Sequence, residues 1–174
     1  MAVRAAGAGW LGPDGDVRTM SRAYVHAAVA ALKADTVIAD WATGGILPRD
    51  PRRSGPNATD DAFETGPAGD IKPVIGVVGG MAVPPPFGIR RSVVDAVDVR
   101  VFAPDYHGLW DGLDAIAVRI HRLLDGYRHS NELPGRFQLE YRMGIRHGGE
   151  LHDVAYDEIR FDVVSVYAPL EVTG

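Results

Sequence analysis

Cysteine is absent from the 174-residue chain, which excludes disulfide bonds and thiolate metal sites. No stretch approaches the roughly 18 consecutive apolar residues of a membrane-spanning helix. The N-terminus also lacks an apolar segment of signal-peptide length. Excess positive charge is missing too, because the net charge is -5, whereas domains that grip nucleic-acid phosphates are usually basic. These absences predict a cytosolic compartment and no membrane partner.

Recognisable catalytic and cofactor motifs are missing as well. The glycine-rich stretch from Gly76 to Gly80 is followed neither by Gly-Lys-Ser/Thr, as in a phosphate-binding loop, nor by a helix, as in a dinucleotide site. No Gly-x-Ser-x-Gly elbow occurs. His147, His152 and Asp153 come nearest to a metal site, but no third ligand can be named, and we interpret them as polar turn residues. We therefore predict no enzyme activity, no catalytic residue, no metal and no cofactor.

The stretch from Ser92 to Tyr127 organises the predicted fold. Its odd positions from Val93 to Val101 are mostly valine, which predicts a strand with that face in the core and a more polar opposite face. Pro104 should end the strand and Asp105 should cap a helix. Apolar residues then recur every three or four positions as far as Tyr127, which predicts one helical face, with Gly126 at the helix end.

The flanking segments add helices before this unit and strands on both sides of it. We expect helices at about 21–33 and 35–41 and strands at 46–47 and 71–78. After the central helix, strands at 137–145 and 156–167 should be joined by a turn at Gly148-Gly149. Alternation along the first of these puts Tyr141, Met143 and Ile145 on the core face. The predicted class is α+β: a single, mostly antiparallel sheet of four to five strands, with the N-terminal and central helices packed on one face.

The expected domain organisation is an N-terminal arm (1–20) and a single α+β domain (21–174) with a long loop at 48–70. Irregular loops of that length are usually functional or disordered. The loop carries a basic cluster and then an acidic one, and the strand at 137–145 has charges on the face opposite its apolar residues. These charges either lie in solvent or contact another subunit. The candidate subunit or partner contacts are Arg49, Arg52, Arg53, Asp60, Asp61, Glu64, Arg136, Glu140, Arg142 and Arg146.

The order of elements resembles that of the tail-terminator (tail completion) proteins of long-tailed bacteriophages. The resemblance covers about residues 21–170 and consists of the element pattern plus short, degenerate motifs, none of them catalytic. The segments that carry it are "AAVAALKADTVIADW" with "GGILP", "VDAVDVRVFAPDY", "LWDGLDAIAVRIHRLLDGY" and "DEIRFDVVSVYAPL". The Ala/Gly-rich arm and the prolines at 84–86 are not part of the resemblance.

The resemblance implies a virion structural protein of the head–tail junction, assembled in the host cytoplasm. Such proteins form a ring, expected to be a hexamer, that caps the tail tube and meets a head-side connector or stopper protein. DNA passes through the lumen only as cargo. Alternatives from the residues alone are another neck, connector or minor tail protein, an enzyme with a site between subunits, or a DNA-binding module that uses the arginines near Phe137.

Overall fold

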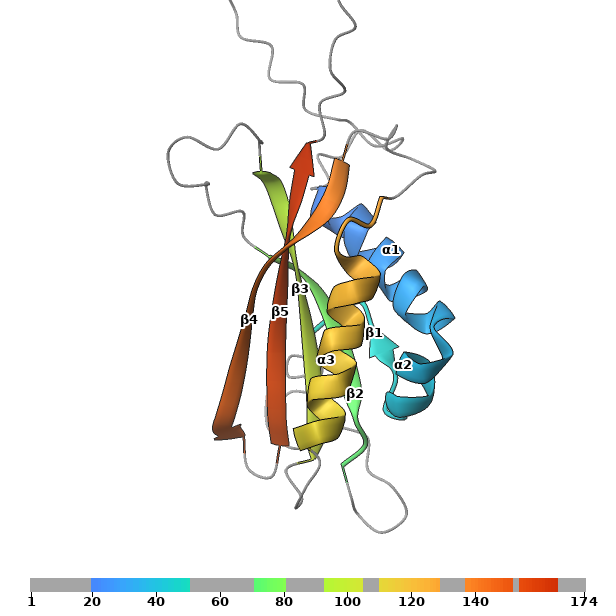
Figure 1. Cartoon of the computed structure of the whole chain (residues 1–174), viewed down its shortest axis with the longest axis vertical. Helices are drawn as coiled ribbons and strands as arrows, with labels where there is room; N and C mark the ends of the chain where they lie inside the picture. Colours follow the sequence, from blue (N-terminus) through green and yellow to red (C-terminus); the bar gives the residue numbers. More distant parts are fainter. Residues whose placement is uncertain are drawn as a thin grey trace, which may run out of the picture.

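The computed structural model describes residues 20–50, 71–80, 93–104, 110–128, 137–151 and 154–165 (Figure 1). Three helices and five strands make up this part of the chain. In chain order they are α1 (Met20–Ala34), α2 (Thr36–Trp41), β1 (Ile46–Leu47), β2 (Val74–Gly80), β3 (Val93–Pro104), α3 (Trp110–Leu124), β4 (Phe137–Leu151) and β5 (Val154–Ser165).

The strands form one sheet in the order β1-β2-β3-β5-β4. Only the β1–β2 pair is parallel, and the β2–β3, β3–β5 and β4–β5 pairs are antiparallel. Helices α1 and α3 lie along one face of this sheet (Figure 1). The predicted α+β class, with a mostly antiparallel sheet and helices on one face, is confirmed.

The main core lies between the helices and this face. It joins α1 and α3 to alternate residues of β3 and β5, which confirms the predicted apolar faces of both helices and of β3. Members with no exposed surface include Tyr24, Leu32, Leu113, Ile120, Val97, Val99, Val101 and Phe161.

Local chemistry explains where two of the helices begin and end. The Asp35 carboxylate accepts a hydrogen bond from the Ile38 amide at 3.1 Å and so caps α2. Gly126 follows α3 with a φ of 77°, in the left-handed region that glycine adopts without strain. The predicted stop at Gly126 is therefore confirmed, whereas the predicted cap at Asp105 lies outside the described residues.

Strand β4 departs from the prediction because it contains a bulge. Tyr141 pairs with Phe161 and Met143 pairs with Arg160, so the register shifts between Tyr141 and Met143. One extra residue reverses every later side chain. Met143 and Ile145 therefore face away from the helices, and Arg146 faces toward them, which is the opposite of the prediction.

Two element boundaries also differ from the prediction. β4 continues through Gly148 and Gly149 to Leu151, with a second register shift after His147, so the predicted turn at the two glycines is wrong. β2 begins at Val74 rather than Ile71 and includes Gly79 and Gly80. No helix in the described part of the chain is long and apolar enough to cross a membrane.

Candidate functional site

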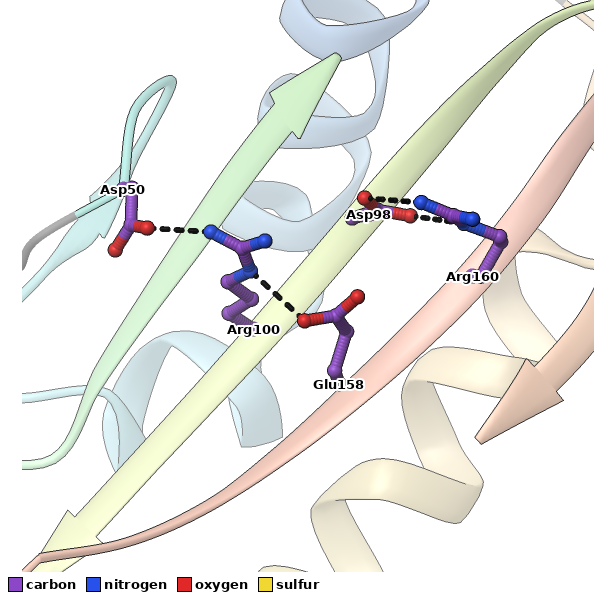
Figure 2. A network of polar contacts seen from close by, with 5 residues as sticks. All are labelled: Asp50, Asp98, Arg100, Glu158 and Arg160. Carbon is purple, nitrogen blue, oxygen red and sulfur yellow. Dashed lines mark hydrogen bonds and ion pairs between the residues drawn. The ribbon is translucent and has the colours of Figure 1, made fainter. Parts of the chain in front are cut away.

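The sheet face that points away from α1 and α3 carries paired charges (Figure 2). Arg160 of β5 donates two hydrogen bonds to the Asp98 carboxylate of β3, at 2.7 and 2.8 Å. Arg100 of β3 donates to Glu158 of β5 at 3.1 Å and, through its other side, to Asp50, which follows β1. Three segments distant in sequence are thus joined by guanidinium–carboxylate pairs across neighbouring strands.

These pairs are only partly accessible to water. Asp98 is 3 % exposed and Asp50 is 5 % exposed, while the Arg160 side chain is 20 % exposed. The hydrogen bonds to Asp98 raise the pKa of Arg160 above its usual value. The guanidinium groups replace the water that these two carboxylates lose on burial, so the network is a structural part of the face.

Asp162 lies on the same face and is less well paired. Its Oδ2 is 3.8 Å from the Arg142 guanidinium, and its Oδ1 is buried with no hydrogen-bond partner among the described residues. Burial raises the pKa of Asp162, and the positive charges of Arg142 and Arg160 oppose that rise. Glu140 lies opposite Asp162 in the β4–β5 ladder and adds a like charge.

The same face also bears a small apolar cluster, at the start of β2, the end of β3 and the start of β5. Phe102 and Tyr156 stack with ring centroids 5.1 Å apart, and Val74 and Val154 are buried beside them. No described helix covers this part of the sheet (Figure 1). Among the described residues, the face away from the helices therefore combines one apolar patch with the ion pairs.

β4 forms one edge of the sheet, and its middle is exposed on both faces. The described residues after α3 contact its first part: Gly126 and Tyr127 make backbone hydrogen bonds with Leu139, and Asp125 accepts from the Tyr141 amide. All residues from Tyr141 to Arg146 are exposed. The apolar members are Tyr141 (42 %), Met143 (43 %) and Ile145 (40 %).

A groove of about 330 Å³ separates this part of β4 from α3. The rings of His121 and Tyr141, which line it, lie with centroids 4.2 Å apart and tilted by 35°, and Arg146, which also lines it, pairs with Asp157 and Asp114. The predicted core position of Tyr141 is therefore wrong, because its side chain is 42 % exposed and lines the groove.

The opposite edge of the sheet is only partly covered. β1 pairs with β2 at Ile75 and Gly76, so the part of the chain that the structure describes provides no strand beside Val77–Gly80. A hollow of about 320 Å³ lies at this edge, lined by Arg49, Asp50, Val78, Gly79 and Arg100.

The predicted contact residues fall in different places. Arg49 lies at the β2 edge, Glu140 and Arg142 lie on the charged face, and Arg146 lies on the helix side because of the bulge. The others are outside the described residues: Arg52, Arg53, Asp60, Asp61, Glu64 and Arg136. Their role in subunit contacts stays a prediction.

Sequence reasoning missed the network of Asp50, Asp98, Arg100, Glu158 and Arg160. The available signal was the polar alternation along β3 and β5, but the pairing depends on the strand register. Within the described residues, no three His, Asp or Glu side chains are grouped so that they could hold a metal ion.

Comparison with known proteins found a fold likeness and no relative in sequence. No protein-family model matches the chain, and no curated protein matches it. Among solved structures, the fold is similar to a chain in "Virion of native gene transfer agent (GTA) particle", with a TM-score of 0.51 and 15 % sequence identity. The likeness covers 81 % of this chain and 92 % of the other. At that identity the match establishes a shared fold.

Proposed function

We propose that this chain is a structural subunit of a phage-like virion and acts at the head–tail junction as a tail terminator. The observation that carries the proposal is the likeness to a chain of a virion particle, which extends over 92 % of that chain. The sequence motifs that resemble tail terminators lie in α1–β1, β3–α3 and β5, which are the elements that build the shared core.

In this role the subunits form a closed ring on the end of the tail tube. A ring needs heterologous contacts, in which one surface of a subunit meets a different surface of the next. The exposed middle of β4 and the end of β2, which has no strand beside it within the described residues, lie toward opposite edges of the sheet and so are two different surfaces. The partners are further copies of this chain, the tail tube protein and a head-side connector or stopper.

The described charges favour DNA as passing cargo over DNA as a bound ligand. Arg100, Arg142, Arg146 and Arg160 of the sheet each pair with a carboxylate of the same subunit. Guanidinium groups already engaged in this way contribute little to phosphate binding, which depends on cations that release counterions from DNA. The charged face holds five carboxylates, three of them buried, against three arginines, so its net charge does not attract phosphate.

The test is the mass of the full chain in solution, by light scattering over a range of protein concentrations, with and without purified tail tubes. We expect a ring, or a monomer that becomes a ring at tube ends. A monomer that ignores tubes contradicts the proposal. Salt-dependent binding to duplex DNA would instead support a DNA-binding module.

A further inference from the structure

The two ends of the sheet differ in a way that makes them complementary. At one end, β4 is an edge strand, and its Met143–Arg146 stretch is exposed. At the other end, β1 pairs with Ile75 and Gly76 of β2 and Val77 is fully buried, so the part of this edge without a strand among the described residues is Val78–Gly80. Within the described residues, β4 thus has a free edge about four residues long, and β2 has a shorter one beside Arg49.

Free edges in natural sheets are normally protected by charged side chains, which resist pairing with another strand. On β4 that protection is weak. The charge of Arg142 is directed to Asp162, and that of Arg146 to Asp157 and Asp114, all in the same subunit. Met143 and Ile145 remain as exposed apolar side chains on the strand, which favours contact with another protein surface.

We propose that the middle of β4 in one copy pairs with Val78–Gly80 of β2 in the next copy, so that the sheets join edge to edge around the ring. This inference rests on the proposed function, because it names the surfaces through which the ring subunits meet. Both edges belong to the same sheet, so each copy offers one edge to each neighbour and the contact is heterologous.

The strand directions fit this arrangement. Going across the sheet from β2 to β3, β5 and β4, every step is antiparallel, so β4 runs opposite to β2. Rotation about a ring axis roughly along the strands preserves strand direction. β4 of one copy then meets β2 of the next as an antiparallel pair, which can form a regular ladder.

Side-chain faces and charges agree as well. Val78 pairs with Asp98, and Ile145 pairs with Glu158, so both lie on the face away from the helices and would remain on one face of the joined sheet. Arg49, exposed beside the β2 edge, forms no ion pair with a described residue. Asp125, which is 49 % exposed, stands near β4 and offers a carboxylate that Arg49 of the next copy can meet.

The chain has no cysteine, which makes disulfide trapping a clean test. Val78→Cys is combined with Met143→Cys in one variant and with Ile145→Cys in a second. Directly opposed residues of an antiparallel pair have Cα atoms about 4.5–5.5 Å apart, within the range that a disulfide spans. Under the conditions where the ring forms, at least one pair should give a ladder of disulfide-linked dimers and higher multiples on a non-reducing denaturing gel. These bands should collapse to monomer on reduction.

Three controls accompany these pairs. Val78→Cys combined with Val118→Cys places the second thiol on the helix side, and combined with Val37→Cys places it on α2, at positions 47 % and 48 % exposed. Neither should form a ladder. The single variant Ile145→Cys should run as a monomer on the same gel without reductant. Thermal melting of each variant confirms that it is folded.

The outcomes separate the two proposals. A ring that forms normally, with no ladder from either Val78 pair, overturns the edge pairing and leaves the ring intact. A disulfide dimer from Ile145→Cys alone indicates twofold pairing of β4 with itself and also overturns it. Absence of any ring, by light scattering with and without tail tubes, refutes the proposed function and the edge pairing together.

Discussion

Replacing Arg160 with methionine tests whether the charged face is a structural part of the sheet. Met keeps much of the side-chain length but removes both hydrogen bonds to Asp98. Asp98 is 3 % exposed, so its carboxylate would be left buried and without that partner.

The expected loss of unfolding free energy is about 3–5 kcal/mol, the range for breaking one partner out of a buried ion pair. Because the Arg160 side chain is 20 % exposed, water can reach part of the gap, which favours the lower end of this range. Domains of this kind unfold with about 5–15 kcal/mol in total, so the variant should be strongly weakened yet able to fold.

Urea unfolding followed by far-UV circular dichroism measures the effect. With a slope of about 2 kcal/mol per molar urea, the midpoint should fall by about 1.5–2 M. Arg119→Met is the matched control, because it removes an exposed arginine that pairs with Asp35 on the helix side, and its effect should be much smaller.

A double-mutant cycle isolates the reason for the loss. Asp98→Asn removes the charge that Arg160→Met leaves behind, so the double variant should be more stable than Arg160→Met alone. A loss below about 1 kcal/mol for Arg160→Met, or a double variant no more stable than that single variant, would refute the reasoning.

Four further predictions concern other parts of the chain. Val99→Asp places a carboxylate among fully buried core residues and should cost several kcal/mol, giving insoluble or unfolded protein; a soluble variant with unchanged melting would contradict the core assignment. Burial raises the pKa of Asp162 above 3.8, so the folded state binds its proton more tightly than the unfolded state does. The contribution of Asp162 to stability therefore falls as pH rises from the pKa of the unfolded state to the raised pKa of the folded state. The melting temperature of the wild type, relative to that of Asp162→Asn, should decrease between about pH 3 and about pH 6, and a constant difference would count against a buried, charged Asp162. Gly126→Ala forces a side chain into a φ of 77° and should lower stability by about 1 kcal/mol in urea titrations; an unchanged midpoint would mean that the turn relaxes without strain. Deleting Ser54–Glu64 should leave a folded monomer that assembles poorly in light scattering, and normal assembly would remove the predicted role of this loop.

The sequence predicted the parts of the fold that depend on local periodicity. Valines two apart identified the core face of β3, and the spacing of three and four identified the buried faces of α1 and α3. A glycine at position 126 marked the end of α3. These features follow from a few neighbouring residues, so a single sequence is sufficient to predict them.

The bulge in β4 could not be predicted in this way. The alternation from Leu139 to Ile145 looks uninterrupted in the sequence, and only pairing with β5 shows that Arg142 is the extra residue. That single insertion exchanges the faces of Ile145 and Arg146. The same limit applies to Gly148-Gly149, which suits a turn but lies within a longer, irregular strand.

The candidate site was harder to predict than the fold. The Arg100–Asp50 and Arg160–Asp98 pairs join residues 50 and 62 positions apart, and their contact depends on the β2–β3–β5 register. The two open edges likewise follow from strand order and not from any motif. The sequence could propose charges for subunit contacts, but it could not show that Arg142 and Arg146 are already paired within the subunit.

The most direct test of the proposed ring is the native mass of this chain by light scattering, measured across protein concentration with and without purified tail tubes. We expect a closed ring of identical subunits, formed in solution or on addition of tubes. A protein that remains monomeric at every concentration and does not associate with tube ends would contradict it.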